Sequence, residues 1–312
     1  MALRALGLGD LLTAVPALRG LADAFPGHHR VLATTPALGR LALATGAVHE
    51  VAPAAPLRPL APGLAFPDVA VNLHGRGPQS HAVLAALRPR RLIAFANREA
   101  GARGPAWRAD EHEVERWCRL LVEEGVPADP ARLELSVPPG PAPADARGAT
   151  IVHPGAADAA RRWPARRYAA VARSEREAGR AVLVTGSGRE ETLAREVAEL
   201  AGLPPAAVLA GRTDALELAR VVAAAGRLVS GDTGVAHLAV AVGTPSVTLF
   251  GPVPPRLWGP PPDRAHHVAL WSGGTGDPHG DHPDAGLLRL EVDDVLDALA
   301  GVSASGAAGT PR

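Results

Sequence analysis

The stretch from Arg227 to Gly259, RLVSGDTGVAHLAVAVGTPSVTLFGPVPPRLWG, constrains the fold of this chain more than any other. It opens with a short apolar run, is broken by GDTG, and continues with residues that include no helix breaker. We predict a buried strand over Arg227–Ser230, a helix over Val235–Val242 and a second buried strand over Ser246–Phe250. A strand–loop–helix–strand unit of this kind is typical of a parallel α/β sheet.

The polar residues of this unit gather where the first strand meets the helix. Asp232 and Thr233 stand at the cap position, and an open parallel sheet binds its ligand at such a junction. Free backbone N–H groups at a helix start favour an anion such as phosphate. His237 lies one turn into the helix, on the same side as Thr233 and Gly234. The alternative is that Asp232 and Thr233 only cap the helix and that His237 is a satisfied core histidine.

Short apolar runs and helical patterns alternate over the rest of the chain, so we expect two α/β domains. The segment PPGPAPADARG, residues 138–148, interrupts this alternation and reads as a linker. We therefore predict a first Rossmann-like domain over 1–140 and a second over 149–300. A chain of 312 residues is long enough for both. The end of the chain, GVSASGAAGTPR over 301–312, is predicted to be a disordered tail.

A second polar junction lies near the N-terminus. A short apolar strand is followed by Gly7-Leu8-Gly9-Asp10 and then by a helical pattern over Leu11–Phe25. The glycines allow a tight turn, and Asp10 is expected at the helix cap, at the ligand-binding edge of the sheet. A dinucleotide site would require a third glycine where Leu12 stands, so this reading is disfavoured. A plain N-cap is the other interpretation of Asp10.

A third junction follows the predicted strand Thr150–His153. Pro154-Gly155-Ala156 comes directly after it, and Arg161-Arg162-Trp163-Pro164 stands a few residues on. Two adjacent cations near a strand end are suited to bind phosphate. A solvated loop turn is the alternative for this arginine pair.

Composition limits the partners of the chain. The formal net charge is zero, so no overall positive field favours nucleic acid. No stretch has 18 uninterrupted apolar residues and the start lacks the order of a signal peptide, so we expect a cytoplasmic protein without a transmembrane segment. The single Cys118 excludes an internal disulfide. Asp277, His279, Asp281 and His282 suggest a metal site, but Gly and Pro lie between them and a polar loop is favoured. His28-His29 and His266-His267 are predicted to be surface turns.

Three motifs now stand in one order along the chain. They are Gly7–Asp10 with Pro16; Pro154-Gly155-Ala156 with Arg161–Pro164; and Asp232–His237 with Pro245, Leu249-Phe250-Gly251 and Gly259-Pro260. Together they resemble glycosyltransferase family 9, the ADP-heptose:lipopolysaccharide heptosyltransferases and their relatives, over roughly Leu3 to Leu299. The resemblance implies the GT-B fold, with two Rossmann-like domains whose parallel sheets face a central cleft. It also implies inversion at the anomeric carbon without a metal or other cofactor.

The resemblance assigns roles residue by residue. Asp10 matches the acidic residue thought to act as general base on the acceptor hydroxyl. Arg161, with Arg162 beside it, stands where the family usually has a lysine that contacts the donor phosphates. An arginine there keeps the charge but presents a planar fork. Glu190 matches a glutamate that holds the ribose of the nucleoside. Asp232, Thr233, Gly234 and His237 match the motif that binds the diphosphate and the donor sugar.

The sequence therefore predicts an inverting, metal-independent glycosyltransferase. The donor is expected to be a nucleoside-diphosphate sugar, in particular an ADP-heptose, and the acceptor a hydroxyl of a glycan or a small molecule. We expect a monomer, with peripheral membrane contact left open. Two alternatives remain: a non-catalytic nucleotide-sugar-binding protein, and another GT-B-like enzyme such as a sugar-nucleotide epimerase.

Overall fold

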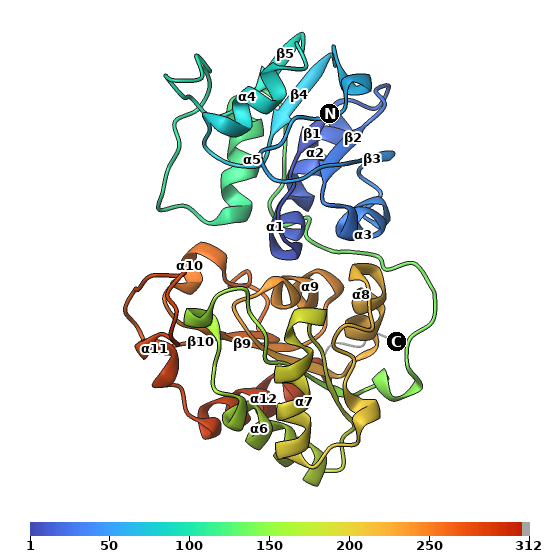
Figure 1. The fold of residues 1–312 in the computed structure, drawn as a ribbon, viewed down its shortest axis with the longest axis vertical. Coiled ribbons are helices and arrows are strands. Elements are labelled where there is room, and N and C mark those ends of the chain that lie inside the picture. Colours follow the sequence, from blue (N-terminus) through green and yellow to red (C-terminus); the bar gives the residue numbers. More distant parts are fainter. Residues whose placement is uncertain (308–312) are drawn as a thin grey trace. The chain divides into compact units, whose positions relative to one another are not determined.

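The structure of the chain, a computed structural model, describes residues 1–307. The chain divides into two compact units, Met1–Ser136 and Val137–Arg312, which we describe separately (Figure 1). Each unit contains one five-stranded sheet, and every strand pairing in it is parallel. Helices connect the successive strands in both units, except that only a short 3-10 helix, Pro62–Leu64, lies between β3 and β4, so the predicted α/β class is confirmed.

The sheet of the first unit has the strand order β3-β2-β1-β4-β5. Its strands are β1 (Ala2–Leu3), β2 (Val31–Thr34), β3 (Glu50–Pro53), β4 (Val69–Asn72) and β5 (Arg91–Ile93). The central strands are buried on both faces, as the apolar runs in the sequence predict. The helices of this unit are α1 (Leu8–Thr13), α2 (Val15–Ala24), α3 (Gly39–Ala44), α4 (Gln79–Ala85) and α5 (Glu113–Glu123).

The first helical segment differs from the prediction. The expected single helix over Leu11–Phe25 is two helices, and α1 starts three residues earlier, at Leu8. Asp10 therefore lies inside the first turn of α1, and its carboxylate accepts a hydrogen bond from the backbone N–H of the N-cap residue Gly7 over 3.1 Å. A carboxylate in this position also suits the positive end of the helix dipole.

The sheet of the second unit has the strand order β10-β9-β8-β6-β7. Its strands are β6 (Thr150–His153), β7 (Val182–Val184), β8 (Arg227–Gly231), β9 (Ser246–Phe250) and β10 (His267–Trp271). The helices are α6 (Ala165–Glu177), α7 (Glu191–Ala201), α8 (Ala215–Ala224), α9 (Gly234–Val242), α10 (Pro255–Trp258), α11 (Ala285–Leu288) and α12 (Val292–Ala307). The β8–α9–β9 unit matches the expected strand–helix–strand order, and α9 ends at Gly243 with a left-handed φ of 76°.

Two features of the second unit correct the sequence analysis. His267 begins strand β10 and is buried, with its Nδ1 2.8 Å from Oγ of Ser246, so His266-His267 is not a simple surface turn. Helix α12 continues past Leu299 to Ala307 and so includes part of the predicted tail. The last residues of that tail, 308–312, lie outside the described residues.

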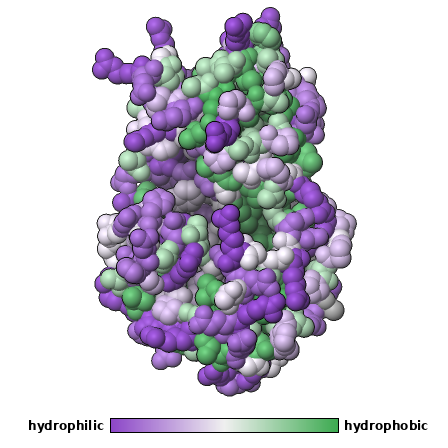
Figure 2. Space-filling view, viewed as in Figure 1, coloured by the Kyte–Doolittle hydropathy of each residue, from purple (hydrophilic) through white to green (hydrophobic). Residues whose placement is uncertain are grey.

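Hydrophilic residues make up most of the surface of the second unit in the space-filling view (Figure 2). Within residues 1–307, no helix is long and apolar enough to cross a membrane. Cys118 is buried in α5, and burial raises the pKa of its thiol to about 12, consistent with a structural residue.

Candidate functional site

The strand orders locate one candidate site in each unit. In an open parallel sheet, ligands bind at the carboxyl ends of the strands where the strand order reverses. In the first unit this reversal falls between β1 and β4, and in the second between β6 and β8. Each of the three predicted motifs follows one of these strands: the Asp10 motif follows β1, the Arg161 motif β6 and the Asp232 motif β8.

In the first unit, Asp10 is fixed by a buried arginine. Arg4 directly follows β1 and is 1% exposed, and its guanidinium lies 3.2 Å from Oδ1 of Asp10. The same guanidinium donates to the backbone oxygen of Asp10 over 2.8 Å and to Oγ1 of Thr13 over 3.3 Å. The Asp10 side chain is 28% exposed, so its carboxylate is accessible to solvent.

Arg4 also forms an ion pair with a second carboxylate. Oε1 of Glu113, in the first turn of α5, lies 2.9 Å from Nη2 of Arg4 and also accepts from the indole N–H of Trp117. Burial alone would raise the pKa of Glu113, but the Arg4 and Arg116 guanidinium groups hold this pKa below its usual value. Arg4 thus has two anionic neighbours, and only Asp10 of the two is accessible.

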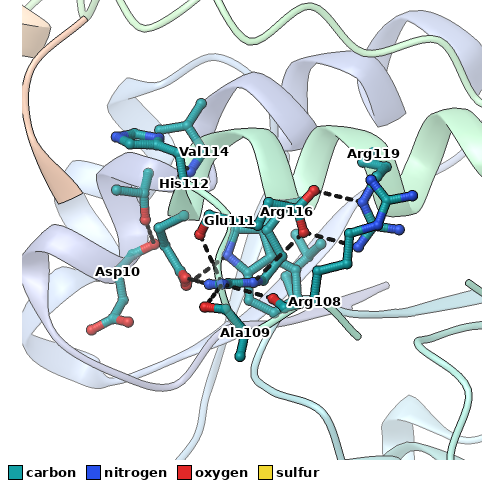
Figure 3. Close-up of polar contacts among 12 residues, drawn as sticks. Asp10, Arg108, Ala109, Glu111, His112, Val114, Arg116 and Arg119 are labelled. Carbon is teal, nitrogen blue, oxygen red and sulfur yellow. Dashed lines mark hydrogen bonds and ion pairs between the residues drawn. The ribbon is translucent and has the colours of Figure 1, made fainter. Parts of the chain in front are cut away.

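Arg116, a buried residue of α5, links this cluster to the segment that precedes the helix. Figure 3 shows its guanidinium among the backbone oxygens of Arg108, Ala109 and Glu111, to which Nη2 donates. The same guanidinium also binds the carboxylate of Glu113. Its Nε is buried without a hydrogen-bond partner among the described residues but lies 4.0 Å from Oε2 of Glu111. We therefore interpret Arg116 as a support that fixes Glu113 rather than as a ligand-binding residue.

In the second unit, Arg161 lies between the ends of β6 and β8. Its Nη2 is 2.7 Å from Oδ2 of Asp158, and its Nη1 donates to the backbone oxygen of Asp232 over 3.4 Å. Its Nε is buried and has no partner among the described residues. The structure thus brings Arg161 and Asp232, two predicted site residues far apart in sequence, into contact.

Asp232 lies at the end of β8 and is 7% exposed. Burial raises the pKa of its carboxyl to about 6, against the opposing effect of Arg161. Two further buried polar atoms without a partner in the described part of the chain belong to its sequence neighbours: Oγ of Ser230 and Oγ1 of Thr233. Native structures rarely leave such atoms unpaired, so this concentration is typical of a site that receives polar ligand atoms.

Helix α9 begins directly after these residues. Thr233 is its N-cap residue, but its side chain makes no capping hydrogen bond, so it is not the simple cap that the sequence allowed. Gly234 is the first helical residue. His237 lies one turn on, and its ring packs edge-on against Trp258 of α10, with the ring centroids 5.7 Å apart.

Glu190 lies beside the loop that follows β6. Its Oε2 accepts from the backbone N–H of Ser187 over 2.7 Å, and a Cβ placed on Gly155 would approach its carboxylate to 2.2 Å. Burial opposes ionisation, but the Ser187 N–H and the nearby charges of His153 and Arg162 hold the pKa of Glu190 below its usual value. Only a residue without a side chain at position 155 leaves room for this ionised carboxylate.

Arg162 turns toward its own loop. Its Nε donates to the backbone oxygen of Ala156 over 2.8 Å, and its Nη2 to that of Ala157 over 3.0 Å. Arg162 therefore braces the segment after β6, whereas Arg161 keeps an unpaired donor.

The polar loop with Asp277, His279, Asp281 and His282 supports the Arg161 segment. The backbone N–H of Ala160 donates to the oxygen of Gly280 over 3.0 Å, and Nδ1 of His279 lies 3.5 Å from Asp158. Within residues 1–307, no group of three or more His, Cys, Asp or Glu residues is arranged to hold a metal ion.

Sequence reasoning missed several residues of these sites, namely Arg4, Glu113, His153 and Asp158. Arg4 interrupts the apolar run Ala2–Leu6 near the N-terminus, which was a usable signal because a buried charge must be paired. Glu113 lies more than a hundred positions from Arg4, and no local pattern connects the two.

With two parallel-sheet units and polar sites at their strand-order reversals, the chain has the architecture of GT-B proteins, which are built from two Rossmann-like domains. Comparison with known proteins agrees. The sequence profile of glycosyltransferase family 9 (heptosyltransferase) matches residues 97–276, more than half of the chain. The chain belongs to this family.

Individual relatives share only moderate sequence identity with this chain. A lipooligosaccharide heptosyltransferase 2 from Haemophilus influenzae is 33% identical over 119 residues, which cover 36% of this chain and only 34% of that protein. A family 9 glycosyltransferase from Veillonella parvula superposes with a TM-score of 0.81 at 19% identity over 97% of this chain and 96% of that one. The Escherichia coli ADP-heptose lps heptosyltransferase II gives 0.80 at 19% identity, with 98% of each chain covered. These structures support the fold of the chain over nearly its whole length.

Proposed function

We propose that this protein transfers a sugar, in particular a heptose, from an ADP-sugar to a hydroxyl of a glycan or small-molecule acceptor, with inversion at the anomeric carbon. The observation that carries this proposal is the group of unpaired buried polar atoms around Asp232 and Arg161. Family membership and the names of the relatives point to a nucleotide-sugar donor with heptose as the sugar.

On this proposal, the second unit holds the donor. As the bond to the sugar breaks, negative charge builds up on the departing diphosphate. Arg161 and the free N–H groups at the start of α9 are suited to stabilise that charge, and Thr233, Gly234 and His237 to bind the diphosphate and the sugar. We assign Glu190 to a ribose hydroxyl, because an ionised carboxylate accepts hydrogen bonds from hydroxyl groups. Arg162 acts by bracing the loop after β6.

The first unit supplies the base. Each oxygen of an ionised carboxylate can accept two hydrogen bonds, so Asp10 can keep Arg4 and the Gly7 N–H as partners and still accept the proton of the acceptor hydroxyl. The deprotonated oxygen attacks the anomeric carbon, the bond to the phosphate oxygen breaks, and the nucleoside diphosphate leaves with the bond electrons.

The test combines the purified chain with ADP-heptose and a lipopolysaccharide that lacks heptose, with UDP- and GDP-sugars as competing donors. We expect release of ADP and labelling of the acceptor, both unaffected by EDTA. ADP-sugar binding without any transfer would favour the non-catalytic alternative. A changed sugar stereocentre in the absence of acceptor would indicate an epimerase. The monomeric state, the cytoplasmic location and contact with a membrane surface stay predictions.

A further inference from the structure

A histidine lies next to Asp10 that the proposed function does not use. His74 follows β4, and β1 and β4 are neighbours on either side of the strand-order reversal. The backbone N–H of Ala5, after β1, donates to Nδ1 of His74 over 3.2 Å. Arg4, whose guanidinium holds Asp10, donates to the backbone oxygen of Leu73, directly before His74. The His74 imidazole is therefore held beside the end of β1, near enough to Arg4 and Asp10 for both charges to affect it.

The contact with Ala5 fixes the tautomer of His74. A backbone N–H can only donate, so Nδ1 must carry a lone pair, and the proton of the neutral ring is on Nε2. Desolvation and the nearby charge of Arg4 lower the pKa of His74, against the effect of Asp10, so the ring is neutral near pH 7. A ring in this state donates from Nε2 and cannot accept a proton there.

The position of the ring is also fixed. Asn72, at the end of β4, accepts the backbone N–H of His74 over 2.9 Å and donates from Nδ2 to Oγ of Ser80 over 2.9 Å. Among residues 1–307 no hydrogen-bond partner is found for Nε2 of His74, which is half-buried. A placed donor beside a carboxylate at the ligand edge of the sheet is suited to orient a polyhydroxylated ligand.

We propose that His74 is an acceptor-binding residue, which donates a hydrogen bond from Nε2 to an oxygen of the acceptor next to the hydroxyl that Asp10 deprotonates. This inference rests on the proposed function and adds the acceptor side of the first unit to it. It makes His74 a donor and not a second base, because Nδ1 is engaged by the backbone and Nε2 carries the proton.

Two substitutions separate this role from a purely structural one. The amide oxygen of asparagine reaches about as far as Nδ1, so His74→Asn keeps a partner for the Ala5 N–H but places no donor at the position of Nε2. The amide nitrogen of glutamine reaches about as far as Nε2, so His74→Gln keeps the donor. We expect His74→Asn to raise the KM for heptose-deficient lipopolysaccharide roughly tenfold, the effect of one hydrogen bond, and His74→Gln to stay within about twofold of wild type. The KM for ADP-heptose should be unchanged in both variants.

The opposite order of effects, with His74→Asn normal and His74→Gln impaired, would show that the ring only supports the Ala5 backbone, and would overturn the inference. Nitrogen-15 NMR of the imidazole, assigned by the signal lost in His74→Gln, should show a neutral ring protonated at Nε2 at pH 7. A ring protonated at Nδ1 or at both nitrogens would overturn the inference while leaving the proposed function intact. Wild-type protein that consumes no ADP-sugar would overturn the proposed function itself and, with it, this assignment.

Discussion

Asp10 carries the base role in the proposed reaction, and Asp10→Asn removes the base while Glu113 still pairs with Arg4. Asp10→Asn keeps an oxygen that can accept the Gly7 N–H, so α1 should remain intact. We expect turnover to fall by about 10²- to 10⁴-fold, the usual contribution of a positioned general base, while the affinity for ADP is unchanged. Steady-state transfer assays and calorimetric ADP titration measure the two quantities. Near-normal turnover would remove Asp10 from this role.

Arg161 offers a test of phosphate binding. Arg161→Ala removes the buried unpaired Nε and the charge, so we expect ADP to bind about ten- to a hundredfold more weakly, the effect of one charge-assisted hydrogen bond. Arg161→Lys, the residue that the family usually has here, should lose less than tenfold. Arg162→Ala is the matched control, since its donors serve the Ala156 and Ala157 oxygens. Equal losses in Arg161→Ala and Arg162→Ala would contradict this distinction.

Asp232 makes stability depend on pH in a defined window. Its pKa is raised by burial from 3.8 to about 6, so between these values the folded state binds a proton more tightly than the unfolded state. The free energy of unfolding therefore falls as pH rises from about 4 to 6. One pKa unit corresponds to about 1.4 kcal/mol. The difference in unfolding free energy between Asp232→Asn and wild type should therefore shift by about 2–3 kcal/mol in favour of the variant between pH 4 and pH 8. Denaturant titrations at both pH values measure this, and an equal difference at each would contradict it.

At the scale of elements, the loop between β6 and α6 depends on Gly155. Its substitution by alanine would bring Cβ within 2.2 Å of the Glu190 carboxylate, which the Ser187 N–H holds in place. We expect Gly155→Ala to cost about 1–3 kcal/mol in stability and to weaken ADP binding. Gly188→Ala, in the same region, is the control, because the nearest atom to its Cβ is the Cα of Gly211 at 4.0 Å. A Gly155→Ala variant as stable as this control would show that Glu190 moves freely.

The elements that the sequence predicted well are those with a purely local cause. Strand β9 has the expected bounds and helix α9 begins one residue before the expected Val235, because each is a run of apolar residues between clear breakers. Strand β10 was missed because its residues, His267–Trp271, include only a short apolar run next to two histidines. This strand forms by pairing with β9, a tertiary contact that no local pattern encodes.

The residues of the candidate sites show the same distinction between local sequence causes and tertiary contacts. Asp10, Arg161 and Asp232 were found because each follows a strand at a polar junction, and the parallel topology places such junctions at one edge of a sheet. The partners that orient them, such as Glu113 for Arg4 and Asp158 for Arg161, depend on side-chain packing. Arg161 and Arg162 are adjacent in the sequence, and this adjacency gave no basis for assigning different roles to them.

At the scale of the whole molecule, the proposed reaction takes its base from the first unit and its donor from the second. The second unit determines the substrate class of this reaction, because it binds the donor nucleotide. The most direct measurement is a thermal unfolding panel with ADP, UDP, GDP, NAD and inorganic phosphate at equal concentration. A ligand at about a hundred times its Kd adds roughly 2.7 kcal/mol of stability, which should raise the midpoint by about 5 °C. We predict that ADP gives this shift in wild type and at most about half of it in Arg161→Ala, as a ten- to a hundredfold weaker affinity requires. No shift with any nucleotide would contradict the donor site built on Arg161, Glu190 and Asp232.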